Sequence, residues 1–350
     1  TRLIGVSWGS EMCIRDSIVG VDLIRTGKDD FYVLEDNCRT PSGVSYMLEN
    51  REIMMKMFPD LFHSNRVLRV DDYPTRLLQT LMSLAPKKCD SSVPTVVLLT
   101  PGHLNSAYYE HTFLSDQMGI EMVEAQDLFV ENDFLYMKTV DGPKKIDVVY
   151  RRIDDDYLDP LAYNPNSVIG VPGITHVYKT GGVNICSAPG AGIADDKAVY
   201  IYVPEMIKFY LGETPILDNV QTWRCERDDD LKYVLENIDE LVIKEVDGSG
   251  GHGMLIGPKS TKQEIEDFSS KLKLHPEGYI AQPTLDLSSS PTLIDNEISG
   301  RRVDLRPFCL LGEKVQLCPG GLTRVALGKG SYVVNSSQGG GVKDTWVLAD

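Results

Sequence analysis

The chain contains the stretch Leu241-Val-Ile-Lys-Glu-Val-Asp-Gly-Ser-Gly-Gly-His-Gly-Met-Leu-Ile256, in which a glycine-rich loop separates two short apolar runs. The pattern predicts a strand, a loop and a second strand, with Lys244 inside the first strand. Glycines let backbone N–H groups approach phosphate oxygens closely, and a lysine adds a positive charge for the same phosphates. The stretch therefore predicts a site for nucleotide phosphates, formed by Lys244, Gly248, Gly250, Gly251 and Gly253.

Other interpretations of this loop are weaker. Gly248 to Gly253 has the spacing GxGxxG, but a dinucleotide-binding loop leads into a helix, whereas Met254 begins a strand-like run. A Walker A loop ends in Gly-Lys-Ser/Thr, which is absent, and a protein kinase has its lysine after the glycine loop. A glycine-rich hairpin turn with a surface lysine stays open as an alternative, and only further motifs can decide.

A second group of polar residues lies near the start of the chain. Apolar runs at residues 18–24 and 31–35 flank a turn-like segment and predict an antiparallel hairpin. Asp22 lies on its first strand, and Glu35 and Asn37 lie two apart at the second, so all three can point to one face. Mg²⁺ accepts such an incomplete oxygen shell when phosphate oxygens and water complete it. Solvated acidic residues on a strand edge are the alternative.

Composition sets the broad class. The chain has 350 residues, 42% hydrophobic and 25% charged, which is enough apolar material for two or three packed units. A net charge of −16 disfavours nucleic acid as a partner, and no apolar run is long enough for a membrane helix. Seven scattered cysteines indicate reduced thiols. We therefore expect a soluble, cytoplasmic protein that binds neither nucleic acid nor membrane.

Apolar spacing outlines the remaining elements. It predicts helices at residues 45–62 and 73–84, and residues 94–123 follow as a strand, a helix and a strand, which is one βαβ unit. A helix at 194–210 is interrupted at Pro204. Further strands are predicted at residues 129–130, 135–138, 147–150, 183–186 and 240–246. These elements predict a small open α/β domain followed by an α+β unit.

The motifs together resemble those of RimK-like and related ATP-grasp ligases. Lys244 with its loop, Asp304-Leu-Arg306-Pro-Phe308 and Asn335-Ser-Ser-Gln-Gly-Gly-Gly341 are similar to the nucleotide-binding lysine and loop, the Asp-x-Arg strand and the Asn segment of these enzymes, in the usual order. Gly20-Val-Asp22 and Glu35-Asp-Asn37 are similar to the segments that come last in those enzymes, yet here they come first. A circular permutation predicts this inversion.

Nearly all of residues 18–350 are similar to the circularly permuted ATP-grasp type 2 proteins, which are related to glutathionylspermidine synthetases. The run Leu34-Glu-Asp-Asn-Cys-Arg-Thr-Pro-Ser-Gly-Val-Ser-Tyr46 is especially close. The resemblance implies a circularly permuted ATP-grasp fold of mixed α/β and α+β class, with a small open α/β domain of the pre-ATP-grasp kind. Family members are longer at both ends, so we expect the C-terminus to be truncated here.

The resemblance divides the chain into four parts. Residues 1–17 form a doubtful segment, in which the run from Val6 to Ser17 resembles translated sequencing adapter, and a genuine but irregular tail is the alternative. Residues 18–90 would be the permuted metal-binding part with a helical linker, 91–190 the substrate domain, and 191–350 the nucleotide-binding subdomains.

The resemblance also implies roles for single residues. Lys197 and Lys244, together with Asp247, Ser249 and the loop glycines, would bind the nucleotide phosphates, and Asn335 would bind the nucleotide as well. The strand Tyr279-Ile-Ala-Gln-Pro283 would border adenine at Gln282. Arg306 would neutralise the transferring phosphoryl group, with Arg302 and Arg324 as substitutes. Substrate recognition would fall to Asn105, Ser106, Arg151, Arg152, Asp154 and Asp155, for which a structural salt-bridge cluster is an equal alternative.

The activity implied is ATP-dependent ligation of a carboxylate to an amine through an acyl phosphate, with ATP and Mg²⁺ as cofactors. The substrates would be small molecules or peptides, and the family suggests a companion protein of the alpha-E domain type. Two alternatives stay open: an MgATP-binding module without ligase activity that serves a partner protein, and a phosphotransferase that stops at a phosphorylated product.

Overall fold

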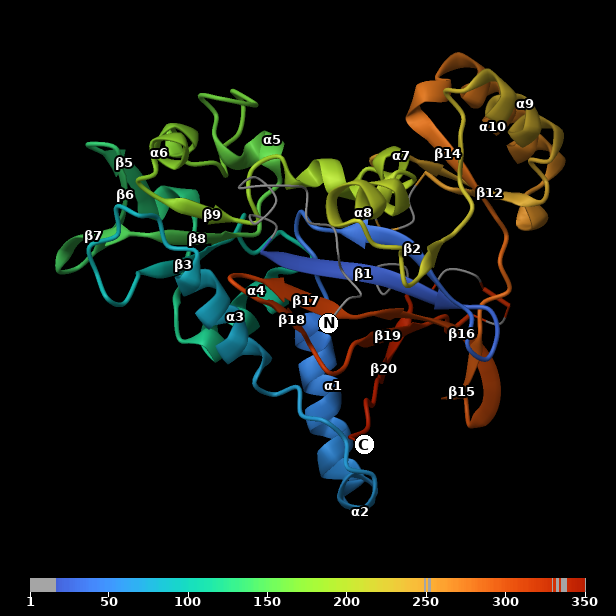
Figure 1. Ribbon diagram of the computed structural model, residues 1–350, viewed down its shortest axis with the longest axis horizontal. Coiled ribbons are helices and arrows are strands. Elements are labelled where there is room, and N and C mark those ends of the chain that lie inside the picture. Colours follow the sequence, from blue (N-terminus) through green and yellow to red (C-terminus); the bar gives the residue numbers. More distant parts are fainter. Residues whose placement is uncertain are drawn as a thin grey trace.

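A central sheet contains strands from both ends of the chain (Figure 1). The computed structural model describes residues 17–248, 250, 253–328, 330–331, 334 and 339–349. The strands of the sheet are β1 (Ile18–Arg25), β2 (Phe31–Asn37), β10 (Asp218–Asn219), β15 (Ser289–Ile294), β16 (Glu297–Arg306), β17 (Phe308–Leu311), β18 (Val315–Leu317), β19 (Leu322–Val325) and β20 (Gly341–Asp344). Within the described residues the sheet has the order β10-β2-β1-β16-β19-β20, while β15 pairs with β16, and β17 pairs with β1 and β18.

The first two strands form the antiparallel hairpin that the sequence predicts. They begin the described chain, yet β1 lies inside the sheet, where it pairs with β16 at Leu23 and Leu305 and with β17 at Gly20 and Phe308. Every residue of β1 except Arg25 is buried, which explains its nearly continuous apolar sequence. The N-terminal hairpin thus completes a sheet whose other long strands come from the C-terminal part of the chain, as a permuted order requires.

Helices α1 (Val44–Met57) and α3 (Tyr73–Ser83) lie on one side of this sheet, and α2 (Pro59–Ser64) follows α1 (Figure 1). The helix predicted at residues 45–62 is therefore present, but it breaks at Phe58. A residue that precedes proline is disfavoured in helical conformation, and Phe58 precedes Pro59.

A parallel sheet forms the second unit. Its strands, in spatial order, are β4 (Glu121–Val123), β3 (Val96–Leu99), β8 (Val148–Arg151) and β9 (Asn184–Cys186). Helix α4 (Tyr108–Met118) connects β3 to β4, which confirms the predicted βαβ unit. Next to it in the chain lie η2 (Ala125–Asp127), β5 (Leu128–Glu131), β6 (Phe134–Thr139), β7 (Gly142–Ile146), α5 (Asp155–Leu158) and α6 (Ile174–Thr180). The sequence pattern did not predict β7, because Gly-Pro-Lys-Lys has no apolar alternation.

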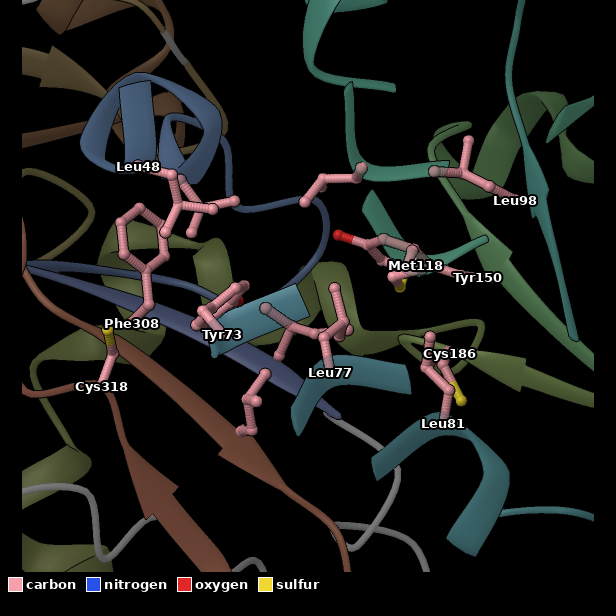
Figure 2. Close-up of a cluster of buried hydrophobic side chains, with 14 of the residues drawn as sticks. Leu48, Tyr73, Leu77, Leu81, Leu98, Met118, Tyr150, Cys186, Phe308 and Cys318 are labelled. Atoms are coloured by element: carbon pink, nitrogen blue, oxygen red, sulfur yellow. The ribbon is translucent and has the colours of Figure 1, made fainter. Parts of the chain in front are cut away.

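One apolar core joins the first two units. Leu77 and Leu81 of α3 belong to the same buried cluster as Phe308 of β17 and as Leu98 and Tyr150 of the parallel sheet. Figure 2 shows α3 between Phe308 on one side and Leu98 and Tyr150 on the other. Burial of this shared surface fixes the parallel sheet relative to the central sheet.

The third unit carries the glycine loop. Its four-stranded sheet has the order β11 (Trp223–Arg224), β14 (Tyr279–Pro283), β12 (Leu241–Glu245) and β13 (Leu255–Ile256). Strands β12 and β13 pair antiparallel, so the predicted strand, loop and strand are confirmed. The sheet shares a core with α9 (Asp228–Glu236) and α10 (Lys262–Leu274), and the short turns η4 (Gly257–Lys259) and η5 (Pro276–Gly278) flank α10.

Short helical segments join the second unit to the third. They are η3 (Ala191–Asp195), α7 (Lys197–Tyr200) and α8 (Val203–Leu211), so the helix predicted at 194–210 is divided into pieces. Asp196 breaks it, because its extended backbone caps α7 and its side chain accepts the N–H groups of Ala198 and Val199. No helix in the described part of the chain is long and apolar enough to cross a membrane. The domain boundaries at residues 90 and 190 stay predictions.

Candidate functional site

The hairpin presents its polar residues as the sequence predicts. Asp22 of β1 is paired with Glu35 of β2, and Gly20 is paired with Asn37. The register shifts between Asp22 and Leu23, so a bulge lies beside Glu35. Because paired residues share a face and residues two apart on a strand do as well, Asp22, Glu35 and Asn37 lie on one face.

Asp22 is fully buried and bound by two arginines. Arg306 donates from Nε to Oδ1 at 2.5 Å and from Nη2 to Oδ2 at 2.8 Å, while Arg324 donates from Nη2 to Oδ2 at 2.7 Å. Burial by itself raises the pKa of Asp22, but the charges of Arg306 and Arg324 outweigh it and hold this pKa well below its usual range. Asp22 is therefore an ionised anchor for two guanidinium groups.

Arg324 also binds Asp304, with Nε donating to Oδ1 at 2.9 Å. The two residues are register partners on β16 and β19. The family resemblance makes Arg324 only a substitute for Arg306, yet the structure brings both to Asp22. Arg302 instead donates to Asp286 at 3.0 Å and to the carbonyl of Gly330 at 3.3 Å, so it has different partners.

Two lysines approach Glu35 from different units. Lys197, at the start of α7, has its Nζ 3.7 Å from Oε2 of Glu35 and donates to the carbonyl of Gly248 at 2.5 Å. Lys244 of β12 donates to Oε1 of Gln282 at 2.8 Å. Burial lowers the pKa of Lys244, with Lys197 acting in the same direction and Glu35 opposing it. Strands β2 and β12 and helix α7 thus bring two cations and one carboxylate together.

Gln282 is buried at the predicted position beside this group. Its Oε1 accepts from Lys244, and its Nε2 donates to Thr222 Oγ1 at 3.0 Å. The side chain therefore has a fixed orientation. It holds Lys244 at the edge between the glycine-loop sheet and the hairpin.

The described part of the loop has the backbone geometry that glycine permits. Gly250 and Gly253 have φ values of +67° and +68°. A Cβ on Gly253 would lie 2.7 Å from the carboxylate of Glu245, and the positive φ makes any larger residue strained there. Asp247 is exposed, and Gly248 donates its N–H to the carbonyl of Glu245 at 3.3 Å. The predicted residues Ser249, Gly251 and Asn335 lie outside the described residues.

The polar face fits a magnesium ion that shares its shell with phosphate. Among the described residues no group of three His, Cys, Asp or Glu side chains is arranged to hold a metal by itself. The Nδ2 of Asn37 is buried without a hydrogen-bond partner among the described residues, and as an N–H donor it suits a phosphate oxygen rather than the metal ion. The side chain of Glu35 is 27% exposed, unlike that of Asp22, which is fully enclosed. Glu35 and Asn37 are both partly exposed, so they are more accessible than Asp22 as oxygen donors, and the nearby lysines suit phosphate.

The predicted substrate residues divide into two groups. Arg151 and Arg152 are buried, and both bind other parts of the protein. Arg151 donates to the carbonyls of Ser187 and Ile153 at 2.6 Å each and pairs with Asp155 at 2.9 Å, which is the structural alternative weighed above. Asp154 and Ser106 are exposed, and Asn105 accepts the N–H of Ala107 at 2.9 Å. A role in substrate recognition stays a prediction for all six.

A second acidic group, Asp36 and Asp195, lies beside the hairpin face. Burial raises the pKa of Asp36 to about 7, and the charges of Asp195, Asp22 and Glu35 act in the same direction. Asp195 accepts the N–H groups of Cys38 at 2.5 Å and Arg39 at 3.1 Å, which ties η3 to the end of β2. The signal available in the sequence was the pair Asp195-Asp196 just before Lys197.

Comparison with known proteins bears on the family and the fold. The sequence model of the family described as "Circularly permuted ATP-grasp type 2" matches residues 7–326. An uncharacterized protein of Synechocystis sp. is 54% identical over 95% of this chain and 69% of its own length. A protein of Frankia casuarinae named "Putative glutamate--cysteine ligase 2-2" is 40% identical over 95% of this chain and 39% of its own length. The chain thus spans about two thirds of one relative and about two fifths of the other.

A solved structure supports the same fold. The glutathione synthetase-like effector from Globodera pallida superimposes with a TM-score of 0.61 at 11% sequence identity, covering 95% of this chain and 75% of the other. Together with the family match, this confirms the predicted fold class.

Proposed function

The chain belongs to the circularly permuted ATP-grasp type 2 family, and from this premise we propose that it is an ATP-dependent ligase joining a carboxylate to an amine. The observation that carries the proposal is the meeting of Lys197 and Lys244 beside Glu35. These residues come from three segments far apart in the sequence. A structural ion pair would need only one lysine, whereas triphosphate binding benefits from both.

The proposed roles follow from the contacts. Lys197 and Lys244 bind the terminal phosphates, and Gln282 orients Lys244. Arg306 stabilises the charge on the transferring phosphoryl group, and Asp22 fixes its guanidinium plane. Glu35 and Asn37 would hold Mg²⁺, with Asp22 on the same face of the hairpin. The ion would supply charge neutralisation at the phosphate oxygens.

The reaction balances without a protein nucleophile. A carboxylate oxygen of the acid attacks the γ-phosphorus of ATP, the bond from that phosphorus to ADP breaks, and an acyl phosphate forms. The amine nitrogen then attacks the acyl carbon, loses a proton and displaces phosphate, which leaves an amide. The residues of this chain contribute by binding, orientation and charge stabilisation.

The acid substrate is proposed to be an amino acid or a small peptide. The name of the Frankia casuarinae relative, which refers to a glutamate–cysteine ligase, supports this class. The Synechocystis relative is longer than this chain. We therefore also propose that the longer protein has this ligase activity and that it acts with a companion protein of the alpha-E domain type.

The test measures ADP and phosphate release from MgATP with pools of amino acids, small peptides and polyamines, and uses Glu35→Gln as control. Release that requires both an acid and an amine supports a ligase. Release with an acid alone would favour the phosphotransferase. Tight MgATP binding without release stimulated by any pool would favour the binding module.

A further inference from the structure

The loop between β2 and α1 contacts Arg306 directly. The carbonyl of Ser42 accepts a hydrogen bond from Nη1 of Arg306 at 3.1 Å. A Cβ added to Gly20 would lie 3.1 Å from Cβ of Pro41 and 3.2 Å from Cδ of Arg306, so Pro41 and Arg306 both pack against this glycine. A shift of this loop would therefore move the guanidinium group that Asp22 holds.

Glu110 of α4 fixes one end of this loop. Its Oε2 accepts the N–H of Gly43 at 2.7 Å, the N–H of Ser45 at 3.1 Å and the hydroxyl of Ser45 at 2.9 Å. Gly43 is the N-cap of α1 and has no side chain to cap the helix. A carboxylate from another unit thus satisfies backbone donors at the start of α1, where a negative charge is favourable.

Arg152, just after β8, holds the same loop from the other side. It donates to the carbonyl of Pro41 at 2.8 Å and to Oγ of Ser42 at 2.6 Å. It also pairs with Glu110 at 3.2 Å, and both side chains are 1% exposed. Loop 41–43 is therefore enclosed by a buried ion pair that belongs to the parallel-sheet unit.

We infer that the buried pair of Glu110 and Arg152 positions Arg306 for phosphoryl transfer by fixing loop 41–43. The inference rests on the proposed function and deepens it, because it makes the parallel-sheet unit part of the geometry of the phosphate site. Glu110 and Arg152 are positioning residues in this inference, because Glu110 binds Gly43 and Arg152 binds Pro41 and Ser42 in the loop that contacts Arg306. Loss of the pair misplaces a group that acts in the transition state, so kcat falls while the KM for ATP changes little.

The chain offers a matched control for a purely structural role. Arg51 is also buried, pairs with Asp344 at 2.7 Å and donates to the carbonyls of Leu68 and Thr345 at 2.8 Å each. These partners lie outside loop 41–43. Arg152→Lys and Arg51→Lys remove comparable buried interactions, but only the first touches the loop that contacts Arg306.

The experiment compares both variants with the parent at a temperature where thermal melting shows all three folded. In ATP turnover we expect Arg152→Lys to lower kcat by about tenfold or more, with the KM for ATP within about twofold. Arg51→Lys should keep the parent kcat. In ¹⁵N-arginine NMR, the Nε–H of Arg306 should exchange with solvent faster in Arg152→Lys and at the parent rate in Arg51→Lys.

The two readouts separate the two proposals. The parent protein could show no ATP turnover while the Nε–H of Arg306 exchanges faster in Arg152→Lys than in the parent. That result would support the positioning role and reject the ligase activity. Equal kcat and equal exchange in both variants would overturn the positioning role. If Arg152→Lys does not fold, Ser42→Ala removes the bond from Arg152 to the loop hydroxyl, together with the local bond from that hydroxyl to the carbonyl of Thr40, and the same readouts decide.

Discussion

Arg306 binds both carboxylate oxygens of Asp22, at 2.5 and 2.8 Å, although 284 positions separate the two residues in the chain. The contact exists because the N-terminal hairpin pairs with β16, the strand that ends at Arg306. Two parallel hydrogen bonds fix the plane of a guanidinium group, which a lysine ammonium cannot reproduce. Asp22 therefore determines the direction in which Arg306 presents its charge.

Arg306→Lys should lower ATP turnover by about a hundredfold or more, since lysine keeps the charge but loses the two-bond geometry. Binding of MgATP should weaken far less. Arg301→Lys, five positions earlier on the same strand, is the control, because Arg301 bonds to Ser299 and the carbonyl of Leu327. Equal ATP turnover in Arg306→Lys and Arg301→Lys would refute the assignment of Arg306 to the site.

Glu35→Gln should abolish Mg²⁺-dependent turnover while leaving the fold intact, because the side chain is partly exposed and the amide has the same shape. Turnover would be followed as ADP release over a magnesium titration, and the fold by circular dichroism. Glu52→Gln on the surface of α1 serves as control. An unchanged magnesium dependence in Glu35→Gln would refute its assignment as a metal ligand.

Affinity for MgATP should fall at alkaline pH, at a lower pH than an ordinary lysine would require. The reason is that burial lowers the pKa of Lys244, so its charge is lost earlier as pH rises. Lys244→Arg keeps its charge and should flatten the affinity profile on the alkaline side. Calorimetric titration at several pH values measures this, with Lys232→Arg on the exposed surface of α9 as control.

If the MgATP affinity of the Lys244→Arg variant fell with rising pH as it does in the parent, another group would control the pH dependence. The shape of the profile is the readout here, because the larger guanidinium group can change the absolute affinity at every pH.

Asp36→Asn should stabilise the protein at neutral and alkaline pH. The folded-state pKa of Asp36 is raised to about 7 from 3.8, so the folded state binds the proton more tightly than the unfolded state. The stability that this provides is complete below about pH 4 and is lost as pH rises through about 7. The variant should gain a few kcal/mol over the parent at pH 8, since a change of one in pKa corresponds to about 1.4 kcal/mol.

Denaturant unfolding of both proteins at pH 4, 6 and 8 checks this prediction. The difference in the free energy of unfolding should grow with pH, and Asp60→Asn on the exposed surface of α2 is the control for loss of a carboxylate. A constant difference across the range would mean that Asp36 does not titrate between these values.

Gly43→Ala should destabilise the fold by roughly 2–4 kcal/mol. Gly43 has a φ of +109°, and a Cβ there would lie 2.5 Å from Cδ2 of Leu322. Gly119→Ala is the matched control, because Gly119 also has a positive φ, of +66°, but has no atom within 4 Å of an added Cβ. It should cost only about 1 kcal/mol. Equal losses in thermal melts would show that backbone conformation alone sets the cost.

Local sequence patterns predicted the parts of the site that depend on one or two neighbouring elements. The two-residue period of a strand placed Glu35 and Asn37 on one face, and the hairpin turn placed Asp22 opposite them. The glycine spacing predicted the loop after Lys244 and the strand β13 beyond it. The order of these motifs indicated the permutation, because motif order is a property of the sequence itself.

Only the tertiary structure decided which charges meet. Arg302 and Arg324 look equivalent in the sequence, yet Arg324 reaches Asp22 because β19 pairs with β16 at Asp304, whereas Arg302 binds Asp286. The sequence left Arg152 between substrate recognition and a structural salt bridge, and the structure places it in a buried ion pair with Glu110. A charged side chain takes its partner and its pKa from strands that become neighbours on folding, and no local pattern encodes those neighbours.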